Sequence, residues 1–305
     1  MNSNSNKYRE ASHAGSWYSS NKNTLDGQLT GWLSNVTNGA GDMGSNARAI
    51  IAPHAGFSYS GPTAAYAYKQ IDPSMVNKVF ILGPSHHVHL KGCALTATSI
   101  CHTPLYDLIV DRPITEKLHA TGCFDWMTQQ TDEDEHSIEM HLPYVAKVMQ
   151  QKRDKYTVVP VLVGNLSKAS ERLYGELFAP YLADPSNLFV ISSDFCHWGK
   201  RFSYSDYEES NGTIAEHIEK LDRMGMELIE RLDTLGFHNY LRDHRNTICG
   251  RHPISVLLNM IDVLKSESGY GKPIGFKFIH YAQSNACRSK NDSSVSYASG
   301  VLTIS

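Results

Sequence analysis

The sequence has no long apolar run, and nothing in it approaches the roughly 20 consecutive apolar residues that a membrane-spanning helix needs. Residues 1–7 are polar and cannot form the hydrophobic region of a secretory signal peptide. Only six cysteines occur in 305 residues and none has Cys-x-x-Cys spacing, which predicts free thiols rather than a disulfide framework. We therefore expect a cytoplasmic protein, with the nucleus as a second location and no membrane insertion.

A strong excess of one charge is also missing. The net charge of −3 gives no electrostatic basis for binding nucleic acid or anionic membranes. Gly-x-Gly-x-x-Gly, P-loop and Gly-x-Ser-x-Gly motifs are absent, so nucleotide-dependent and serine-hydrolase chemistry lack support. What the chain does contain is 41% hydrophobic residues, which is ample for a core.

Apolar runs alternate with helical patterns, which is typical of an α/β protein. We predict one α/β domain with a central, largely parallel β-sheet flanked by helices, after a disordered tail at residues 1–7. The predicted strands are 49–52, 79–82, 93–96, 108–110, 158–163, 188–191, 276–281 and 295–304. The predicted helices are 23–35, 63–70, 168–182, 206–232 and 253–265, with a Gly/Asn/Ser linker at 39–46.

Histidines follow three of the predicted strands. His54 comes after strand 49–52, His86 after strand 79–82, and His197 after strand 188–191. Ligands of open α/β sheets bind beyond the carboxyl ends of the strands, so parallel neighbours would bring these imidazoles together. A single histidine at such a place is more often structural. Three strands with the same ending favour a site, because strand packing does not require imidazole there.

Cys249 lies in a short loop before the predicted helix 253–265, where a thiol tends to have a lowered pKa. The alternative is a buried Cys that acts as a small hydrophobic residue, but its Gly-Arg-His-Pro neighbours favour a functional role. His54, His86 and Cys249 would provide two nitrogens and one sulfur, a set that suits iron, copper or zinc. Asp194 and His197 would then orient the ligands or transfer a proton.

The segment 135–141 invites comparison with zinc-binding helices of the His-Glu-x-x-His type. His136 and His141 are five residues apart, so on one helix they point to different faces, which excludes that arrangement. Residues of this segment could still rim the pocket if part of it is not helical. The acidic run 131–135 is interpreted as a helix start whose carboxylates complement the dipole, with a kink or a late start at Pro143.

Six segments together closely resemble the Memo family, whose proteins are named as mediators of ErbB-receptor-driven cell motility. They are 9–18, 51–56, 82–87, 135–143, 192–199 and 249–253, and the resemblance runs over residues 8–305. It implies one Memo-like domain similar in fold to class III extradiol dioxygenases, which hold Fe(II) on two His and one Glu. By that likeness His54 and His86 match the ligands and His197 the catalytic base. Cys249 stands where those enzymes have a carboxylate, which disfavours ring cleavage.

The resemblance also implies iron or copper binding, a role in redox control and reactive oxygen species, and receptor tyrosine kinase signalling through a bound phosphotyrosine peptide. Trp17, Phe57 and Tyr59 are the expected pocket walls, and Arg201 and Arg251 the candidate phosphate contacts. Two alternatives stay open: an active metal-dependent oxidoreductase or dioxygenase, and a metal-free peptide-binding adaptor. A cysteine hydrolase that uses Cys249 and His197 is a more distant possibility.

Overall fold

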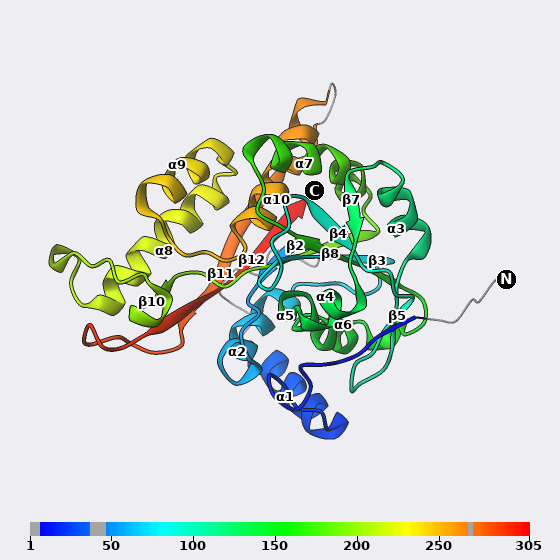
Figure 1. Cartoon of the computed structure of the whole chain (residues 1–305), viewed down its shortest axis with the longest axis horizontal. Helices are drawn as coiled ribbons and strands as arrows, with labels where there is room; N and C mark the ends of the chain where they lie inside the picture. The colour runs from blue at the N-terminus through cyan, green and yellow to red at the C-terminus, as the bar shows by residue number, and fades with distance from the viewer. Residues whose placement is uncertain (1–6, 37–46, 268–270) are drawn as a thin grey trace.

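The computed structural model describes residues 7–36, 47–267 and 271–305 (Figure 1). The predicted linker at 39–46 lies outside the described residues, as does the predicted tail apart from Lys7. Among the described residues, no helix is both long and apolar enough to cross a membrane.

The described residues form one nine-stranded sheet whose central four strands are parallel. These four, in order across the sheet, are β2 (Ala47–Ala52), β9 (Asn187–Ser192), β3 (Lys78–Pro84) and β8 (Thr157–Val163). The flanking strands are mostly antiparallel, so the sheet is mixed: β10 (His197–Trp198), β11 (Ile274–Gln283), β12 (Ser294–Ile304), β4 (Cys93–Leu95) and β7 (Phe124–Trp126). A small second sheet joins β1 (Tyr8–Arg9), β5 (Ile100–Cys101) and β6 (Leu108–Ile109).

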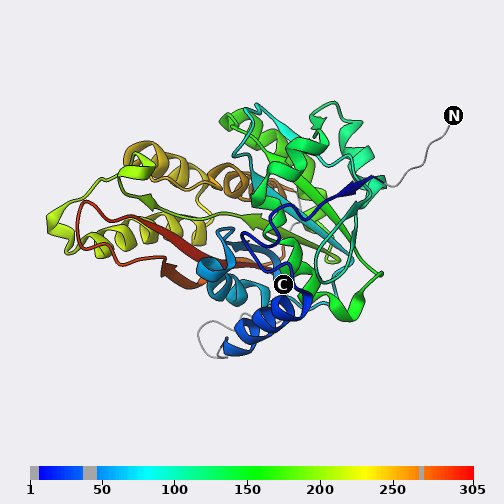
Figure 2. The same cartoon turned by 60° about the horizontal axis from the view of Figure 1, so that its bottom comes forward.

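Helices cover both faces of this sheet, which confirms the predicted α/β class. The described helices are α1 (Lys22–Asn35), α2 (Phe57–Tyr68), α3 (Arg112–His119), α4 (Gln129–Asp134), α5 (His136–Glu139), α6 (Leu142–Val148), α7 (Lys168–Ala183), α8 (Ile214–Glu230), α9 (Thr234–His244) and α10 (Arg251–Ser266). In Figure 2 the blue helix α1 lies below the red strand β12 and the gold helix α9 lies above it. Helices α1 and α2 pack in one core cluster, and α8 and α9 pack in the other.

The core forms because the central strands are apolar on both faces. In β3, Phe80 and Leu82 pack with α7 and α10, whereas Val79 and Ile81 pack with α1, α2 and α6. Strand side chains alternate between the two faces, so a continuous apolar run implies a sheet covered on both sides. This burial fixes the carboxyl ends of β2, β3 and β9 at a common edge.

Two predicted helix starts were wrong. Helix α2 begins at Phe57 rather than at Thr63, because the Phe57 N–H donates to the Trp17 carbonyl across the fold at 2.9 Å, and Pro62 lies inside the helix. Helix α8 begins at Ile214 rather than near residue 206, because Thr213 and Glu216 form a reciprocal capping box there.

The segment after the acidic run is not one helix. Helix α4 ends at Asp134, Glu135 is extended, and its side chain then caps α5 by accepting from the Ser137 N–H. Helix α6 starts at Leu142 with Pro143 in its first turn, as the late-start alternative predicted. The break at Glu135 sets the direction of the next residue, His136.

Candidate metal centre

His54 is held in one tautomer by the end of β9. It follows β2, is buried, and its Nδ1 lies 2.6 Å from Ser192 Oγ. The Ser192 hydroxyl donates its only proton to the Ser137 carbonyl oxygen at 2.7 Å, so it must accept from Nδ1–H. The lone pair of His54 is therefore on Nε2, which is the form that binds a metal ion.

Glu135 orients His86 in the same way. Its carboxylate accepts from the His86 backbone N–H at 2.7 Å and lies 2.9 Å from Nδ1 of the ring. Burial acts to raise the pKa of Glu135, but the hydrogen bonds and charge of His86 outweigh it and lower the pKa to about 2. The carboxylate thus draws the His86 proton to Nδ1 and leaves Nε2 free. Carboxylate-supported histidines are common among metal ligands.

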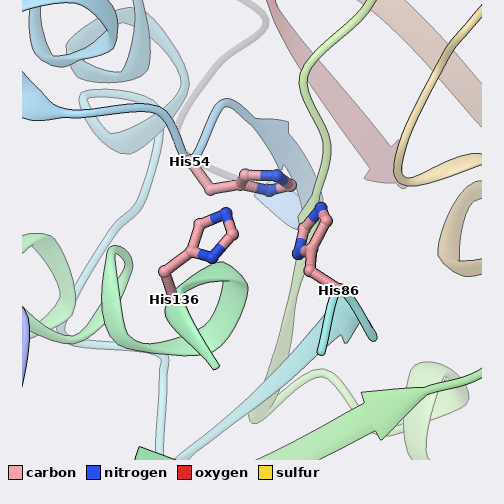
Figure 3. Close-up of side chains that lie close together, drawn as sticks. All are labelled: His54, His86 and His136. Carbon is pink, nitrogen blue, oxygen red and sulfur yellow. The ribbon is translucent and has the colours of Figure 1, made fainter. Parts of the chain in front are cut away.

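His136 completes a group of three imidazoles. The ligand nitrogens of His54, His86 and His136 all lie within 4.8 Å of one another, and the three rings face a common space (Figure 3). The ring centroids of His86 and His136 are 4.4 Å apart. Burial, followed by the charge of His86, lowers the pKa of His136 to about 3, and burial also lowers that of His54. Neutral imidazoles at this spacing could hold a metal ion.

Cys249 lies beside this group. Its Sγ is 3.2 Å from His54 Nε2 and accepts from the Asp194 backbone N–H at 3.2 Å. The sequence predicted a lowered thiol pKa, but burial and the nearby Asp194 charge raise the pKa of Cys249. Gly250 allows the loop to lie this close, because a Cβ there would collide with the Ser192 carbonyl and the Ser193 side chain. The structure thus places His54 close to His86 and Cys249, the other two predicted ligands, and places His136 beside them as well.

Asp194 and His197 border the centre. Asp194 is buried, and its Oδ1 accepts from the His54 backbone N–H at 2.9 Å. Nδ1 of His197 lies 2.9 Å from the Phe195 carbonyl oxygen and 3.1 Å from that of Thr247, so it carries the proton. This leaves Nε2 of His197 as an acceptor at the cavity wall, suited to take a proton from a ligand.

A cavity of about 510 Å³ opens above these groups. It is lined by Trp17, His54, Tyr59, His86, His136, Asp194, His197 and Arg201, among others. The ring of Trp17 lies 4.4 Å from that of His136. Arg201 therefore shares one cavity with two of the three aromatic residues predicted as walls.

Two predicted pocket residues lie elsewhere. Phe57 is only 4% exposed and packs edge-on against Trp32 and Tyr144, because helix α2 begins at this residue and turns the ring into the core. Arg251 lines a separate cavity, since it begins α10 beyond the Cys249 loop.

Sequence reasoning missed Glu135, His136 and Ser192. The acidic run was attributed to a helix dipole, whereas Glu135 caps α5 and holds His86. The available signal was that 135–143 is one of the six Memo-like segments, several of which carry site residues. The break before α5 is stabilised by the buried Arg9, which donates to the Asp132 and Glu139 carboxylates and to the Glu135 carbonyl oxygen.

Comparison with known proteins finds relatives that match nearly the whole chain. The family model for Memo-like proteins matches residues 9–301. Protein MEMO1 of Rattus norvegicus is 59% identical over 296 residues, and protein MEMO1 of Homo sapiens 58%, each alignment covering 97% of both chains. The memo-1 homologue of Caenorhabditis elegans is 54% identical over 97% of this chain and 83% of its own. An uncharacterized Escherichia coli K12 structure aligns with a TM-score of 0.42 and 12% identity, covering 82% of this chain and 98% of its own.

Proposed function

The chain belongs to the Memo-like protein family, and on that premise we propose that it binds an iron or copper ion through His54, His86 and His136. The observation that carries this proposal is the group of three imidazole nitrogens within 4.8 Å, with two of the rings held in fixed tautomers by Ser192 and Glu135. Imidazole ligands beside a thiol suit iron, copper or zinc rather than magnesium or calcium. A bound iron or copper ion would supply one-electron redox chemistry.

The proposal extends to a cytoplasmic role in redox control and in receptor tyrosine kinase and cell-motility signalling, as the family resemblance implies. A phosphotyrosine peptide would enter the cavity above the metal centre. Trp17 and Tyr59 offer aromatic faces for its ring, and Arg201 offers a cation for its phosphate.

An active metal-dependent oxidoreductase is the alternative function, and one observation favours it. His197 lines the same cavity, and its Nε2 carries the lone pair that could take a proton from a substrate. Phe195 and Thr247 hold the ring by their carbonyl oxygens, so its orientation does not depend on a ligand.

Metal analysis of the purified protein tests the main proposal. The protein is dialysed against Fe(II) without oxygen, or against copper or zinc, and its metal content is measured. We expect one ion per chain in the wild type, loss of that ion in His86→Ala, and no loss in His89→Ala, an exposed residue of the same loop. A wild-type protein that binds no metal would contradict this proposal and support the metal-free peptide-binding adaptor.

Two further measurements separate the finer possibilities. Oxygen uptake by the metal-loaded protein with a panel of catechols, lost in His197→Ala, would establish the oxidoreductase. Binding of a labelled phosphotyrosine peptide, weakened in Arg201→Gln and absent for the unphosphorylated peptide, would establish the peptide site. Equal binding of both peptides would exclude it.

A further inference from the structure

A second cavity, of about 440 Å³, is lined in part by the same segment that carries Cys249. Its walls come from α7, α9, the start of α10 and the loops beside them, and include Lys168, Glu171, Arg242, Arg245, Arg251 and His252. None of the groups in the proposed metal centre lines it. We call it the basic cavity, because four of its lining residues are Lys or Arg.

The positive charge of the basic cavity is not balanced within it. Arg242 pairs with Asp243, but Lys168, Arg245 and Arg251 form no ion pair with any of the described residues. Since all three side chains are exposed, their charges are available to a ligand from solution.

Glu171 is the one acidic residue among the described lining residues, and it is already engaged. Its two oxygens lie 2.7 Å from His238 Nε2 and 2.7 Å from His252 Nδ1. Burial acts to raise the pKa of Glu171, but these hydrogen bonds outweigh it and lower the pKa. Glu171 thus orients the two histidines, and its single negative charge leaves the three cations with a net positive charge.

The backbone at the start of α10 and at the end of α9 also contributes to the cavity. The sixteen-residue helix α10 begins at the cavity, and its N-cap, Gly250, provides no side-chain cap. The Arg251 N–H donates to the Ile248 carbonyl oxygen at 3.4 Å and Pro253 has no N–H, so the His252 N–H is the first-turn group left for an anion. Arg245 ends α9 in the left-handed conformation, with φ 50° and ψ 30°. Arg245 itself lines the cavity.

We propose that the basic cavity binds a small phosphate monoester. Lys168, Arg245, Arg251 and the His252 N–H at the start of α10 would bind the phosphate. Leu166 and Leu241 would contact the carbon skeleton. Because no proposed metal ligand lines the basic cavity, ligand binding there does not depend on the metal centre.

Calorimetric titration of the full chain with ribose 5-phosphate, inorganic phosphate and ribose tests this assignment. We expect ribose 5-phosphate to bind about tenfold more tightly than inorganic phosphate, and ribose not to bind. Arg245→Gln and Arg251→Gln should each weaken ribose 5-phosphate at least tenfold. The matched control is Arg172→Gln, which removes the same charge from an exposed position of α7 outside the cavity and should change affinity less than twofold.

Three outcomes would overturn the proposal: no binding of either phosphate compound, binding that the Arg245→Gln/Arg251→Gln double variant retains, or equal affinity for inorganic phosphate and ribose 5-phosphate. The substituted side chains are exposed, so the variants should fold, and circular dichroism checks this. Loss of metal binding in His86→Ala should leave the titration unchanged, which keeps the two proposals distinguishable.

Discussion

Nε2 of His54 lies 3.2 Å from Sγ of Cys249, although 195 residues separate them in the chain. That nitrogen belongs to the three-imidazole group, so the thiol adjoins the position of a bound ion. A soft sulfur ligand there would favour copper, and in particular Cu(I), over harder ions.

Cys249→Ser should therefore change metal preference more than metal capacity. We expect Cu(I) affinity to fall at least tenfold and zinc affinity to fall less, because the three imidazoles remain. Competition with a chromophoric chelator measures both. Cys123→Ser, at a partly exposed thiol outside the cavity, serves as the control. Equal losses for the two metals would show that the sulfur is not a ligand.

Glu135→Gln should weaken metal binding without removing a ligand. The carboxylate accepts from the His86 backbone, from the His86 ring and from the Ser137 N–H, and one amide oxygen cannot replace these contacts. Loss of such a supporting carboxylate typically costs 10–100-fold in metal affinity. The neighbouring Asp134→Asn changes an exposed side chain that accepts from Gln130, and should leave affinity unchanged in the same dialysis assay.

The Arg9–Glu139 pair predicts a pH-dependent contribution to stability. Both side chains are fully buried, and Glu139 Oε2 lies 2.6 Å from Arg9 Nη1. Burial acts to raise the pKa of Glu139, but the bond to His13 and the charge of Arg9 lower it to about 2 from 4.5. Since the folded pKa lies below the unfolded one, the pair stabilises the fold above about pH 4.5, and this contribution is lost as the pH falls toward 2.

Glu139→Gln should accordingly lower the free energy of unfolding by about 3 kcal/mol at pH 7, because the buried Arg9 guanidinium loses one of its two carboxylate partners. Urea titrations at several pH values should show the gap to the wild type closing below pH 4.5. Glu116→Gln removes an exposed partner of Arg112 and should cost no more than about 0.5 kcal/mol. A gap that stays constant with pH would contradict the assignment of charge to Glu139.

Gly250→Ala should displace the Cys249 loop. An added methyl group would collide with the Ser192 carbonyl and the Ser193 side chain, so we expect a loss of about 2 kcal/mol in stability and weaker Cu(I) binding. Gly31→Ala is the opposite case. Gly31 lies in α1, and an added Cβ there would have no neighbouring atom within 4 Å, so the substitution should stabilise the fold by about 0.5–1 kcal/mol. The midpoint of thermal unfolding should therefore fall in Gly250→Ala and rise in Gly31→Ala.

The central strands could be predicted from the sequence because strands buried on both faces read as continuous apolar runs, as in β3 and β8. The same runs located His54, His86 and His197 at the edge of the sheet. The start of α2 could not be predicted, because it depends on a hydrogen bond from Phe57 to the Trp17 carbonyl, a contact between segments 40 residues apart.

His136 was missed for a similar reason. A continuous helix over the acidic run would have turned His136 and His141 to different faces, and the structure does separate them: His141 is buried against the Tyr68 hydroxyl. Only the break at Glu135, held by the buried Arg9 and the His86 loop, turns His136 toward His54. Local sequence patterns cannot predict these contacts, because the contacting residues are far apart in the chain.

The most direct test of the account is X-ray absorption spectroscopy of the zinc-loaded protein, compared with His136→Ala. Imidazole nitrogens at about 2.0–2.1 Å should dominate the first shell, and their outer-shell scattering should correspond to three rings in the wild type and two in the variant. A spectrum that His136→Ala leaves unchanged, or one without imidazole scattering, would contradict a metal centre built on these three histidines.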